Sequence, residues 1–140
     1  MSDIDLTNKE NVQVANRVYI PSGGGNTTYE YDKENKIYKR FVNGDANIDY
    51  ETKEQYTTKN IIVQKINTKV ASDNYYWELE TVGSGNGYYI TNGYAVPIKW
   101  SKASRTEKTK YTYLDGIEVI ISDGNTFIQL QSNSQKLTIE

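Results

Sequence analysis

The stretch Val82-Gly-Ser-Gly-Asn-Gly-Tyr-Tyr-Ile-Thr-Asn-Gly-Tyr-Ala-Val-Pro-Ile-Lys-Trp100 decides the fold class of this chain. Its glycine-rich first half raises the question of a phosphate-binding loop. Such a loop needs a strand before the glycines and a helix after them, whose N-terminal N–H groups bind the phosphate. Here a β-patterned segment follows instead, and Asn92-Gly93 is the strongest short signal for a β-hairpin. We therefore predict that Gly83, Gly85 and Gly87 form a bulged, tight connection between neighbouring strands, where positive φ is favoured.

Strand patterns and turn signals follow one another along most of the chain. The segments expected as strands are 12–20, 29–31, 37–42, 61–66, 75–82, 88–91, 94–100, 117–121, 127–130 and 137–139. Residues 61–66 begin with a continuous apolar run, which predicts a central strand that is buried on both faces. Pro97 lies inside the strand 94–100, and this position predicts an edge strand or a bulge.

These patterns predict an all-β or β-rich α+β fold, as a mostly antiparallel sandwich or partly open barrel of roughly eight to ten strands. At most one short helix is expected, near residues 52–58, because Thr52 and Gln55 have the spacing of a capping box. Residues 1–11 are polar and charged, and we expect them to be a disordered lead-in. Residues 12–140 fit the size of a single β-rich domain.

The composition excludes several classes of function. The net charge is −2, so the chain lacks the basic surplus of a nucleic-acid-binding domain. It contains no cysteine and no histidine, which excludes Cys/His zinc sites, thiol nucleophiles and Ser-His-Asp triads. No apolar run reaches the roughly 20 residues of a membrane span, and the N-terminus lacks the features of a signal peptide.

One acidic segment has part of the pattern of a calcium-binding loop. Asp45, Asn47 and Asp49 place oxygen ligands at alternate positions, but Tyr50 and Tyr56 stand where the loop needs Gly and Glu. We expect a solvated acidic turn there, with no metal and no cofactor. Among the 18 acidic residues no pair is marked as a catalytic acid and base, so we assign no catalytic residue and predict that the chain is not an enzyme.

The most unusual segment is Lys99-Trp-Ser-Lys-Ala-Ser-Arg-Thr-Glu-Lys-Thr-Lys-Tyr111, in which basic residues far outnumber the single acid. Basic groups beside aromatic rings can bind anionic or glycan ligands through charge, hydrogen bonds and stacking. The candidate binding residues are Lys99, Trp100, Lys102, Arg105, Lys108, Lys110, Tyr111, Tyr88 and Tyr89. The alternative is a solvated loop with Trp100 buried at the end of a strand.

The same part of the chain carries a family resemblance. Its ordered motifs are Gly83-Ser-Gly-Asn-Gly-Tyr-Tyr89, the Asn92-Gly93 turn, Ile98-Lys-Trp-Ser-Lys102, the Asp115-Gly116 turn and Gly124-Asn-Thr-Phe-Ile-Gln129. Upstream motifs in the same order are Tyr29–Asp32, Tyr38–Arg40, Asn43-Gly44, Asp49 and Asn60–Gln64. Together they resemble the C-terminal domain of the YerB-like lipoproteins, the DUF3048 family, over most of residues 18–131. The chain departs from the family pattern at Phe127, where Trp is usual, before Gly124, where a proline is missing, and at the inserted run 23–25.

The resemblance implies a fragment of an exported bacterial lipoprotein that is anchored in the membrane by a lipid, with the signal peptide and lipid-bearing Cys outside this chain. It supplies no biochemical function. The expected role is a non-catalytic interaction domain that docks another protein, or the N-terminal domain of its own protein. The alternative is a binding module for cell-wall glycans that uses Trp100, Tyr88 or Tyr89 as stacking platforms, a use that requires those rings to be exposed. An enzyme is the third and least favoured class.

Overall fold

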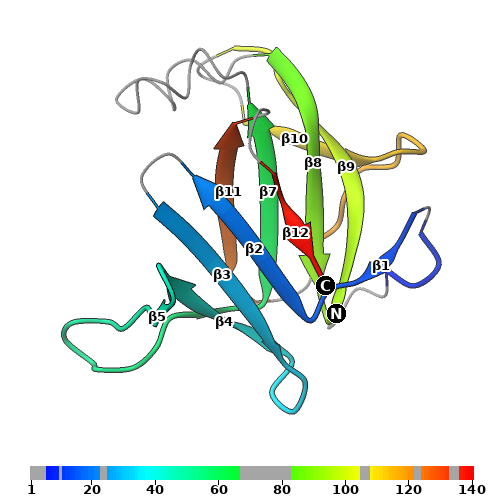
Figure 1. The fold of residues 1–140 in the computed structure, drawn as a ribbon. Coiled ribbons are helices and arrows are strands. Elements are labelled where there is room, and N and C mark those ends of the chain that lie inside the picture. The colour runs from blue at the N-terminus through cyan, green and yellow to red at the C-terminus, as the bar shows by residue number, and fades with distance from the viewer. Residues whose placement is uncertain are drawn as a thin grey trace.

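The structure, a computed structural model, describes residues 6–9, 11–22, 25–66, 83–104, 108–121, 124–132 and 136–140. Twelve strands and their turns account for the regular structure of these residues, which include no helix (Figure 1). Membrane-crossing helices are accordingly not found in this part of the chain. The strands form two mostly antiparallel sheets that do not close into a barrel, so the predicted sandwich is confirmed.

The first sheet contains the stretch that opens the sequence analysis. Its strands, in spatial order, are β1 (Gln13–Val14), β9 (Tyr94–Lys102), β8 (Gly83–Thr91), β7 (Asn60–Ile66) and β11 (Thr126–Ser132), and β10 (Lys110–Tyr113) also pairs with β9. The turn at Asn92-Gly93 joins β8 to β9 as predicted, and Thr91 is paired with Tyr94. Among the described strands, only β11 runs parallel to its neighbour, β7.

The second sheet is built from strands in the first 58 residues of the chain and from its last strand. Its order is β12 (Thr138–Ile139), β2 (Arg17–Ser22), β3 (Gly25–Asp32), β4 (Ile37–Val42) and β5 (Asp45–Ala46), and β6 (Thr57–Thr58) also pairs with β4. The predicted hairpin of 29–31 and 37–42 is therefore present as β3 and β4. In Figure 1, β2 and β12 cross in front of β7, β8 and β11 of the first sheet.

Two hydrophobic clusters cover the two faces of the first sheet. The cluster between the sheets consists of Ala15, Val18, Ile20, Tyr29, Tyr38, Ile61, Val63, Ile90 and Ala95. The cluster on the opposite face consists of Leu6, Ile62, Tyr89, Val96, Ile98 and Tyr113. Residues 61–64 of β7 are buried on both sides, which confirms the predicted central strand. Leu6 is only 1% exposed, so the expected lead-in contains a residue that packs in the second cluster.

The glycines of the opening stretch lie in a strand and not in a connection between strands. Gly85 and Gly87 pair with Trp100 and Ile98 across β8 and β9, and of the three glycines only Gly83 has a positive φ. A Cβ on Gly87 would stand 2.2 Å from the carbonyl oxygen of Val63. The predicted bulged connection is therefore wrong: close packing requires Gly85 and Gly87, and only Gly83 has the positive φ that the prediction expected.

Pro97 occupies a local edge within a central strand. On one side β9 pairs with β8 along its whole length. On the other side it pairs with β1 through Tyr94 and Ala95, and with β10 from Ile98 onward. Pro97 therefore lies in the gap between two short partners, where a missing N–H costs no ladder hydrogen bond.

Two further segments differ from the predicted elements, and one cannot be compared. Residues 52–58 form no helix, because Asp49 caps a turn through the backbone N–H groups of Glu51 and Thr52, and β6 follows. Residues 117–121 form no strand of the two sheets, although they fold back on β10 through a backbone bond from Val119 to Tyr111. The expected strand 75–82 lies outside the described residues.

Tyr38 joins the second sheet to the β8–β9 turn, so its hydroxyl should be important for stability. The hydroxyl donates to the carbonyl of Ala15 at 2.8 Å and accepts from the backbone N–H of Gly93 at 3.1 Å. We expect Tyr38→Phe to lower the free energy of unfolding by about 1–3 kcal/mol, since it leaves two buried backbone groups without this partner. Urea denaturation measures the effect, and Tyr50→Phe, at a ring that is 88% exposed, is the matched control.

The same hydroxyl predicts a specific loss of stability at alkaline pH. Burial is the main reason that the pKa of Tyr38 is raised well above its ordinary value. Above pH of about 10 the unfolded chain releases this proton while the folded chain keeps it, so stability decreases as the pH rises. Because Tyr38→Phe removes this group, the variant should lose less stability than the parent when the pH is raised from about 9 to about 11. Parallel curves for parent and variant would contradict the assignment.

Candidate functional site

The hairpin of β9 and β10 brings the predicted basic residues together. Lys99 lies within β9 and Lys102 at its end, while Lys110 begins β10 and pairs its backbone with Ser101. Lys108 precedes β10 by two residues. Arg105 lies outside the described residues.

Three of these lysines line one depression, which we call the lysine depression. It has a volume of about 380 Å³, and its lining residues are Gly83, Ser84, Ser101, Lys102, Ala103, Lys108 and Lys110. The described lining residues include three lysines and two serines, and none of them carries a carboxylate. In the part of the chain that the structure describes, no ion pair joins these lysines to an acidic residue.

Small residues at the start of β8 keep this depression open. The register of the β8–β9 hairpin places Gly83 opposite Lys102 and Ser84 opposite Ser101. No heavy atom lies within 4 Å of the position that a Cβ on Gly83 would take. Gly83 has no side chain and Ser84 and Ser101 have short ones, so these lining residues leave room beside the longer lysines.

A second hollow continues from the first along the same hairpin. It has a volume of about 310 Å³, and its lining residues are Ser84, Gly85, Asn86, Lys99, Trp100, Ser101 and Thr112. The two hollows share Ser84 and Ser101. Lys99 is exposed beside the second hollow, so all four described lysines of the predicted set lie at one of the two hollows.

The aromatic members of the predicted set are mostly buried. Trp100 is 4% exposed, and its Nε1–H donates to the carbonyl of Lys65 at 2.8 Å. Tyr89 is fully buried, and its hydroxyl is 3.0 Å from Oδ1 of Asn60. These two side chains belong to the core, which is the alternative that the sequence left open for Trp100.

The other two predicted tyrosines are half-buried and lie apart from each other. Tyr111 donates its hydroxyl to Oε1 of Gln64 at 3.0 Å, and burial raises the pKa of Tyr111. Tyr88 packs against the cluster between the sheets and lines a separate hollow with Leu137. The structure therefore groups the lysines but does not provide one aromatic platform beside them.

Ser84 and Ser101 are site residues that the sequence reasoning missed. The sequence did contain a signal for them. A two-residue turn at Asn92-Gly93 pairs residues at equal distances from the turn, and this places Ser84 opposite Ser101. Extending the predicted hairpin pairing away from the turn as far as Lys102 would have placed Ser84 beside the basic segment, which already contains Ser101.

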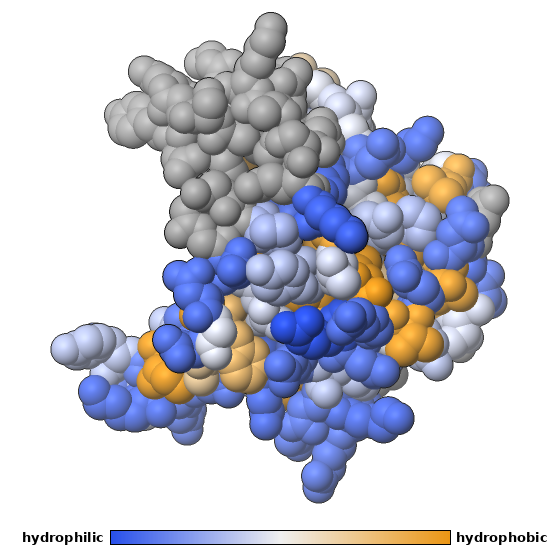
Figure 2. Space-filling view, viewed as in Figure 1, coloured by the Kyte–Doolittle hydropathy of each residue, from blue (hydrophilic) through white to orange (hydrophobic). Residues whose placement is uncertain are grey.

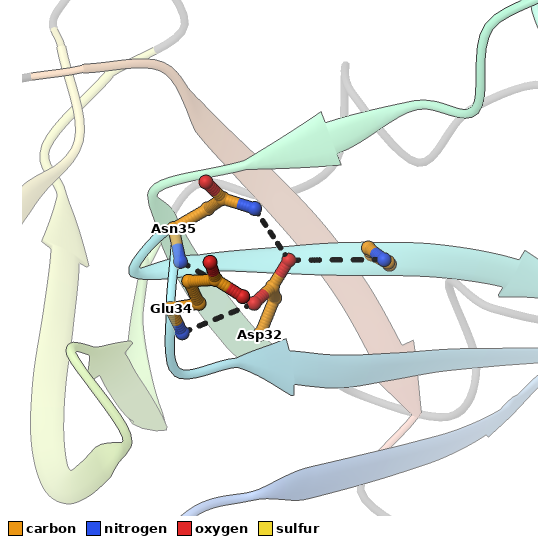
Figure 3. A network of polar contacts seen from close by, with 4 residues as sticks. Asp32, Glu34 and Asn35 are labelled. Atoms are coloured by element: carbon orange, nitrogen blue, oxygen red, sulfur yellow. Dashed lines mark hydrogen bonds and ion pairs between the residues drawn. The ribbon is translucent and has the colours of Figure 1, made fainter.

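Two carboxylates whose pKa is lowered have structural roles in turns. Figure 3 shows Asp32 accepting hydrogen bonds from Asn35 and from the backbone of Glu34, and Lys39 lies 3.7 Å away. Hydrogen bonds, first of all from the side chain of Asn35, lower the pKa of Asp32. Backbone N–H groups, with Thr52 first, lower the pKa of Asp49 in the same way. Neither carboxyl group has the raised pKa of a general acid.

The partial calcium motif contributes to a hairpin instead of a ligand shell. Oδ1 of Asn47 accepts from Arg40 at 2.6 Å, and Oδ2 of Asp49 accepts from the hydroxyl of Tyr56. Among the described residues, no group of three or more acidic side chains is placed to hold a metal ion. The same hairpin exposes Ile48 and Tyr50. Hydrophilic residues predominate in the coloured part of the molecular face in Figure 2.

Comparisons with known proteins agree with the fold and with the ordered motifs. The sequence profile described as "Protein of unknown function (DUF3048) C-terminal domain" matches residues 12–128. The crystal structure of YerB protein from Bacillus subtilis is similar, with a TM-score of 0.68 and 17% identity over 96% of this chain. The match covers 45% of that chain, so this chain spans less than half the length of its structural relative. None of the curated proteins compared with this chain matches it.

Proposed function

Since this chain belongs to the family of the DUF3048 C-terminal domain, we propose that it is a non-catalytic binding domain of an extracytoplasmic, lipid-anchored bacterial protein. Its ligand enters the lysine depression. The observation that carries the proposal is that Lys102, Lys108 and Lys110 line one concave surface, and no carboxylate is among its described lining residues. The resemblance to lipoproteins supports the extracytoplasmic part of this proposal.

The electrostatics of the depression favour an anionic partner. Ammonium groups that line one hollow repel one another. A bound anion attracts each of them, and this attraction offsets the repulsion. The lining residues around the lysines offer hydroxyl groups and backbone, which can donate further hydrogen bonds to an anion. Recognition of charge is therefore the use that these groups support best.

The partner can be a protein, the N-terminal domain of the same protein or a cell-wall polymer, provided that it carries negative charge. A glycan module that stacks sugars on Trp100 or Tyr89 is opposed by the burial of both rings. A wall polymer remains a candidate because anionic groups could enter the depression without any ring stacking.

Binding to insoluble bacterial cell wall tests this proposal. The test variant combines Lys102→Ala, Lys108→Ala and Lys110→Ala, and the control variant combines Lys33→Ala, Lys39→Ala and Lys53→Ala, which removes the same charge elsewhere. We expect the parent and the control to bind and the test variant to lose most of its binding at low salt. Circular dichroism of all three proteins checks the fold.

Equal binding by all three proteins would reject the lysine depression as the docking surface. If the parent does not bind the wall, the wall is excluded as a partner. The same three proteins are then titrated with the isolated N-terminal domain of a DUF3048 protein, where loss of binding in the test variant would support docking within one protein.

A further inference from the structure

We infer that the lysine depression is a site for a phosphate group, carried by a polar organic ligand that extends into the neighbouring hollow. This inference rests on the proposed function and names the class of ligand. It depends on three features: the types of residues in the lining, the arrangement of the charges, and the size and continuity of the two hollows.

The lining differs from the centre of a protein–protein interface. Such centres are enriched in aromatic residues, methionine and arginine, and they are depleted in lysine, serine and alanine. The described lining residues of the lysine depression are all glycine, serine, alanine or lysine. It is also concave, and its volume of about 380 Å³ falls within the range of small-ligand sites, about 300–1,000 Å³. A compact anionic group fits this surface better than an acidic protein face.

The charge arrangement favours phosphate over carboxylate. A carboxylate presents its two oxygens in one plane, which the flat fork of a guanidinium matches. The described lining contains no guanidinium and instead has three ammonium groups, which act as separate point charges with rotatable donors. A tetrahedral phosphate presents oxygens in several directions, so it suits donors that are not held in one plane, such as the lysines and the hydroxyl groups of Ser84 and Ser101 in this lining.

The second hollow indicates that the ligand is larger than phosphate alone. It shares Ser84 and Ser101 with the lysine depression and leads along β8 and β9 toward Asn86 and Lys99. Asn86 offers an amide donor and acceptor, and Lys99 offers another positive charge. A phosphate in the depression would therefore be followed by a polar organic group, with a second anionic group near Lys99.

A titration with two small anions of similar charge at neutral pH tests the inference. Pyrophosphate supplies phosphate groups and citrate supplies carboxylates, and amide chemical shifts of ¹⁵N-labelled protein report both affinity and location. We expect pyrophosphate to bind at least about tenfold more tightly than citrate, with the largest shifts at residues 83–86 and 101–103. Lys108→Ala/Lys110→Ala should weaken this binding about tenfold, which corresponds to about 1.4 kcal/mol. Lys33→Ala/Lys53→Ala, the charge-matched control, should leave it unchanged.

Two outcomes overturn the inference. Equal affinity for pyrophosphate and citrate would show that the site responds to charge alone, and the largest shifts elsewhere would show that the phosphate site is not here. Either result leaves the proposed function intact if the lysine variants still lose their binding to cell wall or to the N-terminal domain. Failure of the proposed function itself gives a different result: the lysine substitutions then leave the binding of both anions, of the cell wall and of the N-terminal domain unchanged.

A sedimentation assay separates the two sources of such a phosphate. Vesicles of phosphatidylglycerol present it as a lipid head group, and vesicles of phosphatidylcholine are the neutral control. If the parent co-sediments with the anionic vesicles and Lys108→Ala/Lys110→Ala abolishes this, the phosphate is assigned to lipid. Pyrophosphate binding without co-sedimentation assigns it to a soluble compound or polymer.

Discussion

Trp100→Ala is expected to lower the free energy of unfolding by about 4 kcal/mol. Replacing a buried tryptophan by alanine usually costs about 3–5 kcal/mol, because it removes buried apolar area and leaves a cavity. Trp100 is 4% exposed and lines the second hollow, next to the lysine depression. Its Nε1 also donates to the carbonyl of Lys65, and its ring contacts the backbone at Gly85. The loss of packing and of this hydrogen bond both destabilise the first sheet.

Chemical denaturation of three proteins measures this effect. Trp100→Phe retains an aromatic ring but lacks the donor, so it should lose about half as much stability as Trp100→Ala. Tyr50→Ala removes an exposed ring and should change the free energy of unfolding by less than about 1 kcal/mol. A Trp100→Ala protein as stable as the parent would show that the ring is exposed, and the glycan-stacking alternative would then regain its platform.

This expectation determines which variants can test binding. A protein that lacks Trp100 loses binding through damage to the fold, whether or not the ring contacts a ligand. The lysines of the depression are different, since Lys108 and Lys110 are exposed and their replacement should change stability by about 0.5 kcal/mol or less. They are therefore the residues whose substitution reports on the ligand.

The sheet architecture could be predicted from the sequence where the signals are local. The Asn92-Gly93 hairpin and the apolar run that begins the segment 61–66 each depend on neighbouring residues, and both predictions were confirmed. The parallel pairing of β11 with β7 joins segments about 65 residues apart in the chain, as in the pair Phe127 and Ile61. No local pattern states which strand such a distant segment will join.

The candidate site was predicted in part. The lysines are neighbours in sequence, so their clustering on one hairpin follows from the turn between β9 and β10. The burial of Trp100 was also available from strand periodicity, because Val96, Ile98 and Trp100 occupy alternate positions and face the same side. Arginine or lysine beside an aromatic residue suggests a binding platform only when both side chains point to the same face.

The glycines show a limit of a different kind. In sequence, Gly85 and Gly87 suggest a turn, because positive φ is the commonest reason for glycine. The actual reason is the close approach of the backbone of β7 and the ring of Trp100, which are about 20 residues away in the sequence. These contacts can be predicted only after the strands have been paired. Close approach of another segment leaves no mark in the local sequence that distinguishes it from a turn.

Gly87→Ala is expected to lower the free energy of unfolding by about 3 kcal/mol or more. Gly87 has no positive φ, so alanine meets no conformational penalty there. The added Cβ would instead stand 2.2 Å from the carbonyl oxygen of Val63, in the central strand β7. Overpacking of a core by a methyl group costs about 1–3 kcal/mol when side chains can move. Here the obstacle is the backbone of a strand that is buried on both faces, so β7 and β8 must separate.

Two neighbouring substitutions make the measurement specific. Asn86→Ala changes an exposed side chain in the same strand and should alter stability by about 0.5 kcal/mol or less. Gly85→Ala meets Nε1 of Trp100 at 2.7 Å, a side-chain atom, and should lie between the other two. A Gly87→Ala protein that unfolds at the same urea concentration as the parent would contradict the pairing of Gly87 with Gln64 beside Val63. The same β8 strand places Gly83 and Ser84 at the lysine depression. That result would therefore also contradict the position of these two residues in the proposed site.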